Sequence, residues 1–179
     1  MMLDQAGIKF EAQSPEFDED SVKRQAGLGG EELALRLAQG KALSIDGCDS
    51  DWVIGSDSTV SVAGRRYSKP RSRDDAADHL RAFSGQIMEL ASAVALANDA
   101  QIDWSYGETA RLHIRPLSED FIQSYLDEEW PEVGYCVGVF RLEGRGVTLF
   151  DAIDGNYFTI LGMPLLPLLG ALRDRGLTR

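Results

Sequence analysis

Residues 87–97 read IMELASAVALA, an apolar run typical of a strand in the middle of a sheet. Residues 108–115 form a second strand pattern, in which Leu112 and Ile114 alternate with polar side chains. No helical pattern separates these two runs. Parallel neighbours in a sheet need a long crossover connection, usually a helix, so the sheet is predicted to be mixed rather than purely parallel.

Outward from this pair, strand and helix patterns follow one another without an internal repeat or a linker. Further strands are expected over residues 51–54, 59–62, 138–142 and 146–153. Helical spacing and capping residues predict helices over residues 31–45, 72–85, from 118 onward and 164–176. The predicted fold class is therefore α/β, with a mixed sheet and flanking helices in a single domain over residues 1–179.

Composition narrows the class of protein. The chain has 179 residues and a net charge of −11, which argues against a nucleic-acid partner because phosphate contacts need a basic face. No apolar run approaches the roughly 20 residues that span a membrane, and the opening MMLDQAGIKF lacks the features of a secretory signal. Cys48 and Cys136 are too isolated for a disulfide framework or a zinc site. We therefore expect a cytoplasmic protein without membrane contact.

One segment is strongly basic, although the chain as a whole is acidic. Residues 64–73 read GRRYSKPRSR and carry only basic charges. A compact basic segment on an acidic protein suggests a small polyanionic ligand rather than a long one, although a solvated loop is the alternative. Within it, Lys69 is a compact charge suited to a phosphate group, or else it serves solubility.

Two acidic positions are candidates for cation binding. Asp57 directly follows an apolar run, and ligand sites in α/β sheets favour the carboxyl ends of strands. A carboxylate there could hold Mg²⁺, which prefers oxygen ligands and substrate phosphates, or it could be an ordinary turn residue. Glu19 lies in PEFDED, residues 15–20, where adjacent acids repel each other and a cation would offset the repulsion. The alternative for Glu19 is an exposed acidic loop.

The remaining polar candidates have simple alternatives. Arg141 and Glu143 would share a face of the strand expected there, and they could pair with each other. His79 and His113 show no metal-ligand spacing, so both are expected to be structural or exposed.

A larger pattern emerges when the segments are taken in order. They are LDQAGIKFEAQSPEFDED (3–20), LALRLAQGKA (33–42), VIGSDSTV (53–60), YSKP (67–70), IRPLSEDFIQSYL (114–126), GVFRLEGRG (138–146) and GNYFTILGMPLLPL (155–168). Together they resemble the Maf family of nucleoside triphosphate pyrophosphatases over nearly the whole chain. The resemblance implies a mixed α/β architecture like that of the inosine triphosphatases, often dimeric.

The resemblance also implies a reaction, in which a nucleoside triphosphate is hydrolysed to its monophosphate and pyrophosphate. Glu19 and Asp57 would hold Mg²⁺ or Mn²⁺, and one of them could orient the attacking water. Lys69 would join them in catalysis, and Lys41 would offset phosphate charge. Glu143 stands where the family often has Gln and, with Arg141, would bind substrate. The implied substrates are noncanonical or methylated nucleotides, with Glu143 resembling the 7-methyl-GTP branch, or pyrimidine triphosphates.

The chain departs from the family pattern at three places. Ser68 replaces a Gly, Met88 stands where His is common, and the usual Ser-x-Ser-Pro-Arg segment would precede Met1. We therefore expect the natural gene to encode about a dozen further residues. The departures leave open a catalytically impaired Maf-like protein that binds nucleotide or a cell-division partner, and a small acidic interaction domain.

Overall fold

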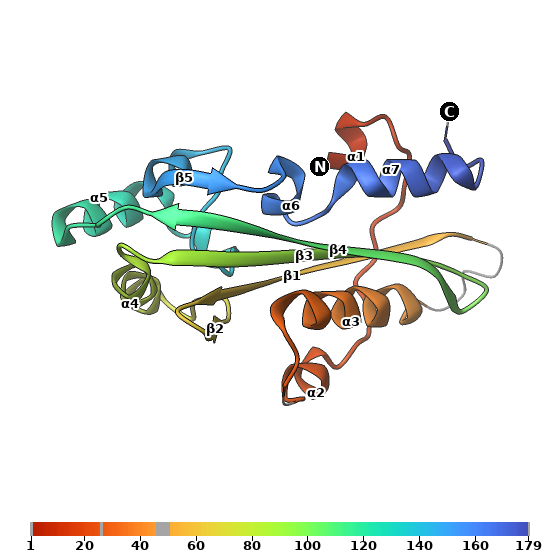
Figure 1. Cartoon of the computed structure of the whole chain (residues 1–179), viewed down its shortest axis with the longest axis horizontal. Helices are drawn as coiled ribbons and strands as arrows, with labels where there is room; N and C mark the ends of the chain where they lie inside the picture. Colours follow the sequence, from red (N-terminus) through yellow and green to blue (C-terminus); the bar gives the residue numbers. More distant parts are fainter. Residues whose placement is uncertain (1, 26, 46–50, 179) are drawn as a thin grey trace.

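The computed structural model describes residues 2–25, 27–45 and 51–178, and it contains a five-stranded sheet flanked by helices (Figure 1). In spatial order the strands are β2 (Arg65–Tyr67), β1 (Val53–Val62), β3 (Ile87–Asn98), β4 (Gln101–Ile114) and β5 (Phe150–Asp154). The helices are α1 (Met2–Gln5), α2 (Glu19–Lys23), α3 (Gly30–Leu43), α4 (Arg73–Phe83), α5 (Glu119–Glu129), α6 (Tyr157–Ile160) and α7 (Leu165–Asp174). Two 3-10 segments are η1 (Glu132–Tyr135) and η2 (Arg145–Leu149). The predicted α/β class with flanking helices is confirmed.

The sheet is built around β3, whose residues 90–97 are buried without interruption. Each described strand pairing is antiparallel, so the parallel part of the expected mixed sheet is not found among the described strands. The long β3–β4 hairpin accounts for the centre, since strands joined by a tight turn run in opposite directions. Asp99 and Ala100 form that turn with positive φ values of 49° and 56°.

One correction concerns β1. The two short strands expected around Gly55-Ser56-Asp57 are one continuous strand, and Asp57 lies in its middle rather than past its end. Its neighbour Ser56 donates a side-chain hydrogen bond to the Ala93 carbonyl at 2.9 Å, so this polar segment is held to β3 instead of turning away. Asp57 pairs with Ala93 in the ladder.

Helix α3 lies on one face of the sheet, below it in Figure 1, in contact with β1, β3 and β4. The contact is made almost entirely by buried alanines, which are Ala34, Ala38 and Ala42 on the helix and Ala91, Ala93, Ala95 and Ala97 on β3. Gly55 is the point of closest approach, because a Cβ there would lie 2.2 Å from the Ala38 carbonyl oxygen and 2.6 Å from the Ala42 nitrogen. Small side chains therefore let the helix backbone rest directly on β1.

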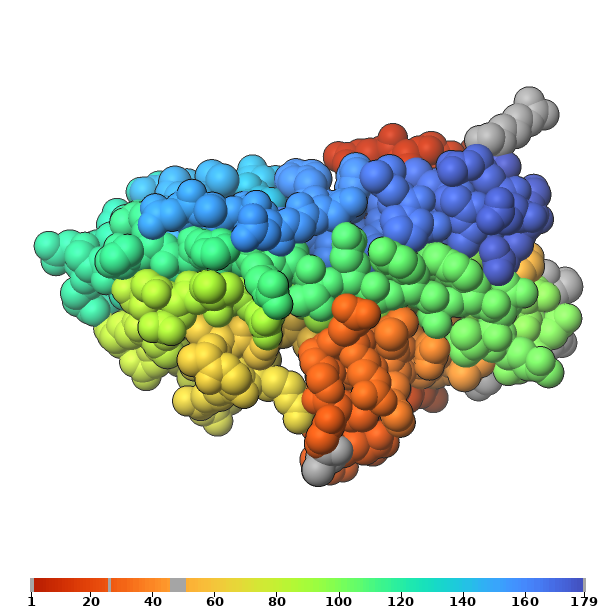
Figure 2. Space-filling view, viewed as in Figure 1, coloured from red at the N-terminus to blue at the C-terminus, as the bar shows by residue number. Residues whose placement is uncertain are grey.

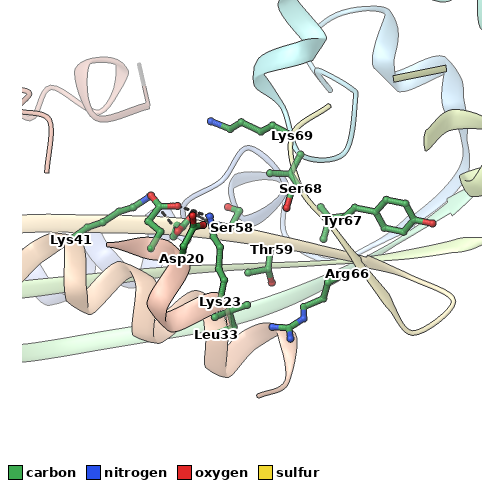
Figure 3. A pocket seen from close by; sticks show the side chains of 14 residues that line it. Asp20, Lys23, Leu33, Lys41, Ser58, Thr59, Arg66, Tyr67, Ser68 and Lys69 are labelled. Carbon is green, nitrogen blue, oxygen red and sulfur yellow. Dashed lines mark hydrogen bonds and ion pairs between the residues drawn. The ribbon is translucent and has the colours of Figure 1, made fainter. Parts of the chain in front are cut away.

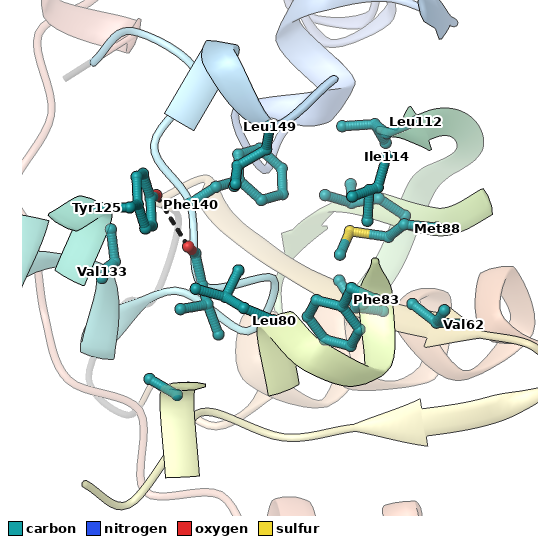
Figure 4. Packing of buried hydrophobic residues seen from close by; sticks show 14 of the residues in the cluster. Val62, Leu80, Phe83, Met88, Leu112, Ile114, Tyr125, Val133, Phe140 and Leu149 are labelled. Carbon is teal, nitrogen blue, oxygen red and sulfur yellow. Dashed lines mark hydrogen bonds between the residues drawn. The ribbon is translucent and has the colours of Figure 1, made fainter. Parts of the chain in front are cut away.

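The other face carries the larger side chains. One cluster joins α4, α5 and the sheet, with Phe83, Met88, Leu112 and Tyr125 almost fully buried (Figure 4). A second cluster packs α7 and α1 against β3 and β4 through residues such as Val94, Leu96 and Leu168, above the sheet in Figure 1. The predicted helix starts are confirmed at Ser72 and Ser118, whose side chains accept hydrogen bonds from the backbone N–H groups of Asp75 and Phe121.

The strand expected over residues 138–142 is wrong. This segment is a series of turns in which Val139 has a φ of +56°, and its carbonyl accepts a 3.0 Å hydrogen bond from the buried Tyr125 hydroxyl. Its apolar residues are buried by packing into the cluster of large side chains rather than by strand pairing. The strand expected over 146–153 is partly correct, since η2 takes its first part and β5 begins at Phe150. Cys48 lies outside the described residues.

Candidate active site

A cleft of about 470 Å³ opens between the α2–α3 pair and the segment that begins at β2 (Figure 2). In Figure 2 it is the hollow between the orange and yellow surfaces. Its volume lies within the range of small-molecule sites. Its lining residues are Glu19, Asp20, Lys23, Leu33, Lys41, Asp57, Ser58, Thr59, Val60, Arg66, Tyr67, Ser68, Lys69 and Val137. Glu19, Lys41, Asp57 and Lys69, which are far apart in sequence, therefore meet around one space.

Three of these residues form a compact charged cluster at one end of the cleft (Figure 3). The Lys41 Nζ lies 2.9 Å from Glu19 Oε1 and 3.2 Å from Asp57 Oδ2, so one ammonium group bridges both carboxylates. The other oxygen of Glu19, Oε2, is 2.5 Å from the Nζ of Lys23, one helical turn along α2. Two lysines thus neutralise the two acids.

The cluster is held in place by the fold beneath it. Lys41 comes from the last turn of α3 and Asp57 from the middle of β1, and Gly55 lets these two elements touch. Phe17 places α2 against α3, because its ring occupies the space where a Cβ on Gly40 would lie, 2.1 Å from the ring's Cζ atom. The glycine that weakens the helical pattern in the sequence is therefore required by the contact that positions Glu19.

The surroundings of Glu19 and Lys41 favour the charged form of both side chains. Burial would raise the pKa of Glu19, but Lys23 and Lys41 outweigh it and lower that pKa to about 2. Burial would lower the pKa of Lys41, but Glu19 and Asp57 outweigh it and raise that pKa above its ordinary value. Both groups are therefore charged at neutral pH.

Asp57 has one satisfied and one available oxygen. Its Oδ1 accepts a hydrogen bond of 2.7 Å from the Ser58 backbone N–H, which fixes the carboxylate against β1. Its Oδ2 is shielded from solvent and accepts no hydrogen bond from any residue of the described ranges, although Lys41 approaches it as an ion pair. A buried carboxylate oxygen without a hydrogen bond is costly unless a cation completes its surroundings.

A divalent cation such as Mg²⁺ fits this end of the cleft. Glu19 and Asp57 each direct an oxygen at the same point, now held by Lys41, and the free Oδ2 lone pairs suit a hard cation. Within residues 2–25, 27–45 and 51–178 no group of three or more His, Cys, Asp or Glu side chains gathers as a complete metal cage. Mg²⁺ is often held by one or two carboxylates together with waters and substrate phosphates, so a two-carboxylate site is sufficient.

The opposite wall of the cleft carries the basic segment. Arg66 from β2 and Lys69 from the loop after it both line the cleft, with Tyr67 and Ser68 between them (Figure 3). The basic window of the sequence is therefore divided, with two of its charges at the cleft. Leu33, Val60, Tyr67 and Val137 add apolar surface to the same space. The cleft thus combines a carboxylate end, a basic wall and an apolar area.

Two predicted substrate-binding residues do not line this cleft. Arg141 does not pair with Glu143; instead its Nη2 donates a 2.9 Å hydrogen bond to the buried carboxylate of Glu129 on α5, because the segment turns rather than running as a strand. Glu143 is exposed on that turn. Burial is the main cause that raises the pKa of Cys136, with Glu143 acting in the same direction and Arg141 and Lys69 opposing it.

Sequence reasoning did not propose several of the polar lining residues for the site, among them Asp20, Lys23, Ser58 and Thr59. Lys23 had a signal, since it lies four residues after Glu19 at the spacing that lets oppositely charged helix residues pair. The expectation for the histidines is confirmed: His79 packs between Tyr67 and Phe83, and His113 pairs with Asp154 at 2.9 Å. Neither lines the cleft.

Comparison with known proteins finds a matching family and similar proteins over nearly the whole chain. The model of the family described as "Maf-like protein" matches residues 1–175. A "7-methyl-GTP pyrophosphatase" of Rhizobium meliloti is 41% identical over 98% of this chain and 90% of its own length. A "Nucleoside triphosphate pyrophosphatase" of Nitrobacter hamburgensis is 44% identical over 98% of this chain and 88% of its own. One of the same name from Caulobacter vibrioides is 40% identical over 98% of this chain and 90% of its own.

The same described ranges contain no helix with the length and apolar character needed to cross a membrane.

Proposed function

The chain belongs to the Maf-like protein family, and from that premise we propose that it hydrolyses a nucleoside triphosphate to the monophosphate and pyrophosphate. The observation that carries the proposal is the cluster of Glu19, Asp57 and Lys41 at one end of a nucleotide-sized cleft, opposite Arg66 and Lys69. Acids that can hold a cation and bases that can face phosphates are the two requirements of such a reaction.

The charged residues of the cleft have distinct proposed roles in this reaction. Glu19 and Asp57 would hold a divalent cation, Mg²⁺ or Mn²⁺, which supplies charge neutralisation and polarisation of a phosphoryl oxygen when bound. Lys41 and Lys69 offset the charge that develops on the phosphate oxygens as the bond between the α and β phosphates breaks. A carboxylate of the cluster orients the water, whose oxygen adds to the α-phosphorus while pyrophosphate leaves with the α–β bridging oxygen and the proton of the water passes to solvent. Such a site acts mainly by positioning and electrostatics.

The substrate class is proposed as a methylated or noncanonical purine nucleotide. The relative from Rhizobium meliloti is named for 7-methyl-GTP. In this chain Val137 and Tyr67 give the cleft an apolar area for a base, and Glu143 lies on the turn that follows Val137. A carboxylate accepts hydrogen bonds only, so it suits the ring N–H and amino group of a guanine edge. Arg141 would then act on the base indirectly, by fixing that turn through Glu129.

Pyrophosphate release from a panel of nucleoside triphosphates with Mg²⁺ or Mn²⁺ tests the proposal. We expect turnover, with 7-methyl-GTP preferred over dTTP and UTP. Binding of nucleotides without product, seen as a thermal shift alone, would instead support a nucleotide-binding protein that has lost catalysis. If the chain neither bound nor hydrolysed any nucleoside triphosphate of the panel, the proposed function would be wrong.

A single substitution tests the role of Glu143. Glu143→Gln should shift the preference toward pyrimidine triphosphates by roughly 1–3 kcal/mol, the scale of one mismatched polar contact. Because Glu143 is exposed, the unfolding temperature should not change. A wild-type enzyme that already prefers dTTP or UTP would contradict this role.

Two further properties complete the proposal. We place the activity in the cytoplasm, where nucleoside triphosphates and Mg²⁺ are both abundant, and we expect a homodimer, as the family resemblance implies. Light scattering of the purified chain distinguishes a dimer from a monomer.

A further inference from the structure

The carboxylates that would hold a cation are already neutralised by side chains of the protein. The Lys23 Nζ lies 2.5 Å from Glu19 Oε2, and the Lys41 Nζ lies 2.9 Å from Glu19 Oε1. Lys41 also forms an ion pair with Asp57. Glu19 has no carboxylate oxygen left without an ammonium partner. A metal ion that approaches Glu19 therefore meets positive charge at both oxygens, and it binds more favourably if one lysine withdraws.

The two lysines are not equally free to move. The Lys41 side chain is 21% exposed and is fixed on α3, which rests on the sheet. The Lys23 side chain is 41% exposed and belongs to α2, a five-residue helix with no buried residue. Lys23 also lines the cleft, so its flexible side chain can reach a ligand without leaving the site. Lys23 is therefore the group that can most easily exchange partners.

The charge balance indicates where the lysine would go. Glu19, Asp57, Lys23 and Lys41 together carry no net charge, so a divalent cation alone would meet two repelling ammonium groups. A triphosphate alone would meet two repelling carboxylates. When both enter together, the cation pairs with the carboxylates and the displaced ammonium pairs with phosphate oxygens, so each of the four side chains keeps a partner of opposite charge.

We propose that Lys23 is a positioning residue that serves as a stand-in cation: it holds Glu19 when no metal is bound and transfers to the triphosphate when metal and nucleotide bind together. The consequence is that the free metal binds weakly and that metal and triphosphate strengthen each other's binding. This inference rests on the proposed function for the identity of its ligands, but its test does not require turnover.

Calorimetry with Mn²⁺ alone, and with inorganic tripolyphosphate in the presence of Mn²⁺, tests the exchange. Lys23→Gln should bind Mn²⁺ alone about 3- to 10-fold more tightly than wild type, because a nearby positive charge has been removed. The same variant should bind tripolyphosphate about 3- to 10-fold more weakly, because an ammonium partner is missing. A merely structural role would weaken both ligands, so the opposite signs identify the exchange.

Two controls keep the result interpretable. Lys23→Arg retains the charge and should behave like wild type toward both ligands. Lys9→Gln makes the same change in net charge at an exposed position beside Ile8 and Phe10, which pack with α7, and should alter neither affinity. Unchanged Mn²⁺ affinity in Lys23→Gln, or weaker binding of both ligands, would overturn the exchange. If Lys23→Gln shows the opposite-sign pattern but the wild-type protein cleaves no nucleotide, the exchange stands and the proposed function fails.

Discussion

The two faces of the sheet are packed in different ways. On the α3 face, alanines and Gly55 bring a helix backbone against β1, with a virtual Cβ of Gly55 only 2.2 Å from the Ala38 carbonyl oxygen. On the opposite face, large side chains such as Phe83 and Leu112 fill a buried cluster. The charged cluster of Glu19, Lys41 and Asp57 lies on the α3 face.

The difference separates two tasks. Large apolar side chains remove more surface from water and therefore contribute more to stability. Contacts between backbones leave less freedom of placement than contacts between flexible side chains, so they suit groups that must meet at about 3 Å. The comparison predicts that substitutions in the large-residue cluster change stability, whereas substitutions on the α3 face change the site.

The largest effect is expected in the large-residue cluster. Leu112 is completely buried on β4, so Leu112→Ala should lower the free energy of unfolding by about 2–5 kcal/mol through lost burial and a cavity. At temperatures where the variant remains folded, its kcat and KM for the nucleotide should stay close to wild type. Denaturant unfolding and steady-state kinetics measure both quantities.

The matched control is Ile87→Ala on β3, where the side chain is 47% exposed and the loss should be far smaller. A large change in kcat for folded Leu112→Ala would show that the two faces are coupled.

The next effect concerns the site. Asp57→Asn preserves shape but removes a charge that would hold the cation, so turnover should fall at least about 100-fold, or roughly 2.7 kcal/mol of transition-state stabilisation. The variant should still fold, because the Ser58 N–H can donate to the amide oxygen, but loss of the ion pair with Lys41 should lower its unfolding temperature somewhat. Unchanged turnover would exclude Asp57 from the mechanism.

A third substitution acts on the α3 contact itself. Gly55→Ala places a methyl group against the Ala38 carbonyl oxygen and the Ala42 nitrogen, and backbone atoms cannot move aside without shifting α3. The expected cost is about 1–3 kcal/mol of stability. Because α3 carries Lys41 and β1 carries Asp57, turnover should also fall about 10-fold. Thermal unfolding and kinetics on the same sample compare the two losses.

Gly170→Ala provides the control. This glycine lies in α7, where a Cβ would meet only the end of the Arg173 side chain at 3.8 Å. Alanine is the better helix former, so this variant should be neutral or slightly more stable and fully active. If Gly55→Ala also retained full activity, the precision attributed to the α3 contact would be unnecessary.

The sequence predicts the parts of this molecule whose signals are local. The apolar run 87–97 and the capping residues Ser72 and Ser118 each decide their element through neighbours in the chain, and the structure agrees. The expectation for segment 138–142 is wrong because its apolar residues resemble a strand, whereas they are buried by packing into the core cluster and the Tyr125 hydroxyl of α5 holds the Val139 carbonyl. The contact between Tyr125 and Val139 is a tertiary contact, and it produces no periodic pattern of apolar residues in the sequence.

The site shows the same limit. Four of the six residues inferred from motifs, Glu19, Lys41, Asp57 and Lys69, line one cleft, whereas Arg141 and Glu143 do not. The sequence gives no sign that Gly55, a residue of β1, lies against the backbone of α3, because that contact joins two separate elements of the fold. The partner of Arg141 could not be foreseen, since Glu129 belongs to an element whose placement depends on the whole core.

The smallest expected effect tests where the two regions meet. His79 on α4 contacts Tyr67, which lines the cleft, with ring centroids 5.0 Å apart, and it lies beside Phe83 of the large-residue cluster. Burial lowers its pKa below the ordinary 6.5, and Arg65 and Arg71 act in the same direction, while Asp75 and Asp78 oppose them.

A histidine whose pKa is lowered by folding is more easily protonated when unfolded, so it reduces stability as the pH falls through 6.5 toward the folded pKa. Replacing it with a side chain that does not titrate should therefore flatten the pH dependence of the unfolding temperature just below pH 6.5. His79→Gln should differ from wild type in that slope by no more than about 2–4 °C, the shift produced by roughly 1 kcal/mol in a chain of this length.

His113→Gln is the control, because the chain has two histidines and His113 lies on β4, paired with Asp154 away from the cleft. If nucleotide KM follows the same pH change in wild type and loses it in His79→Gln, Tyr67 transmits the state of the large-residue cluster to the cleft. If only the unfolding temperature changes with the protonation of His79, nucleotide binding in the cleft does not depend on the large-residue cluster. The two faces of the sheet then act independently even where Tyr67 contacts both.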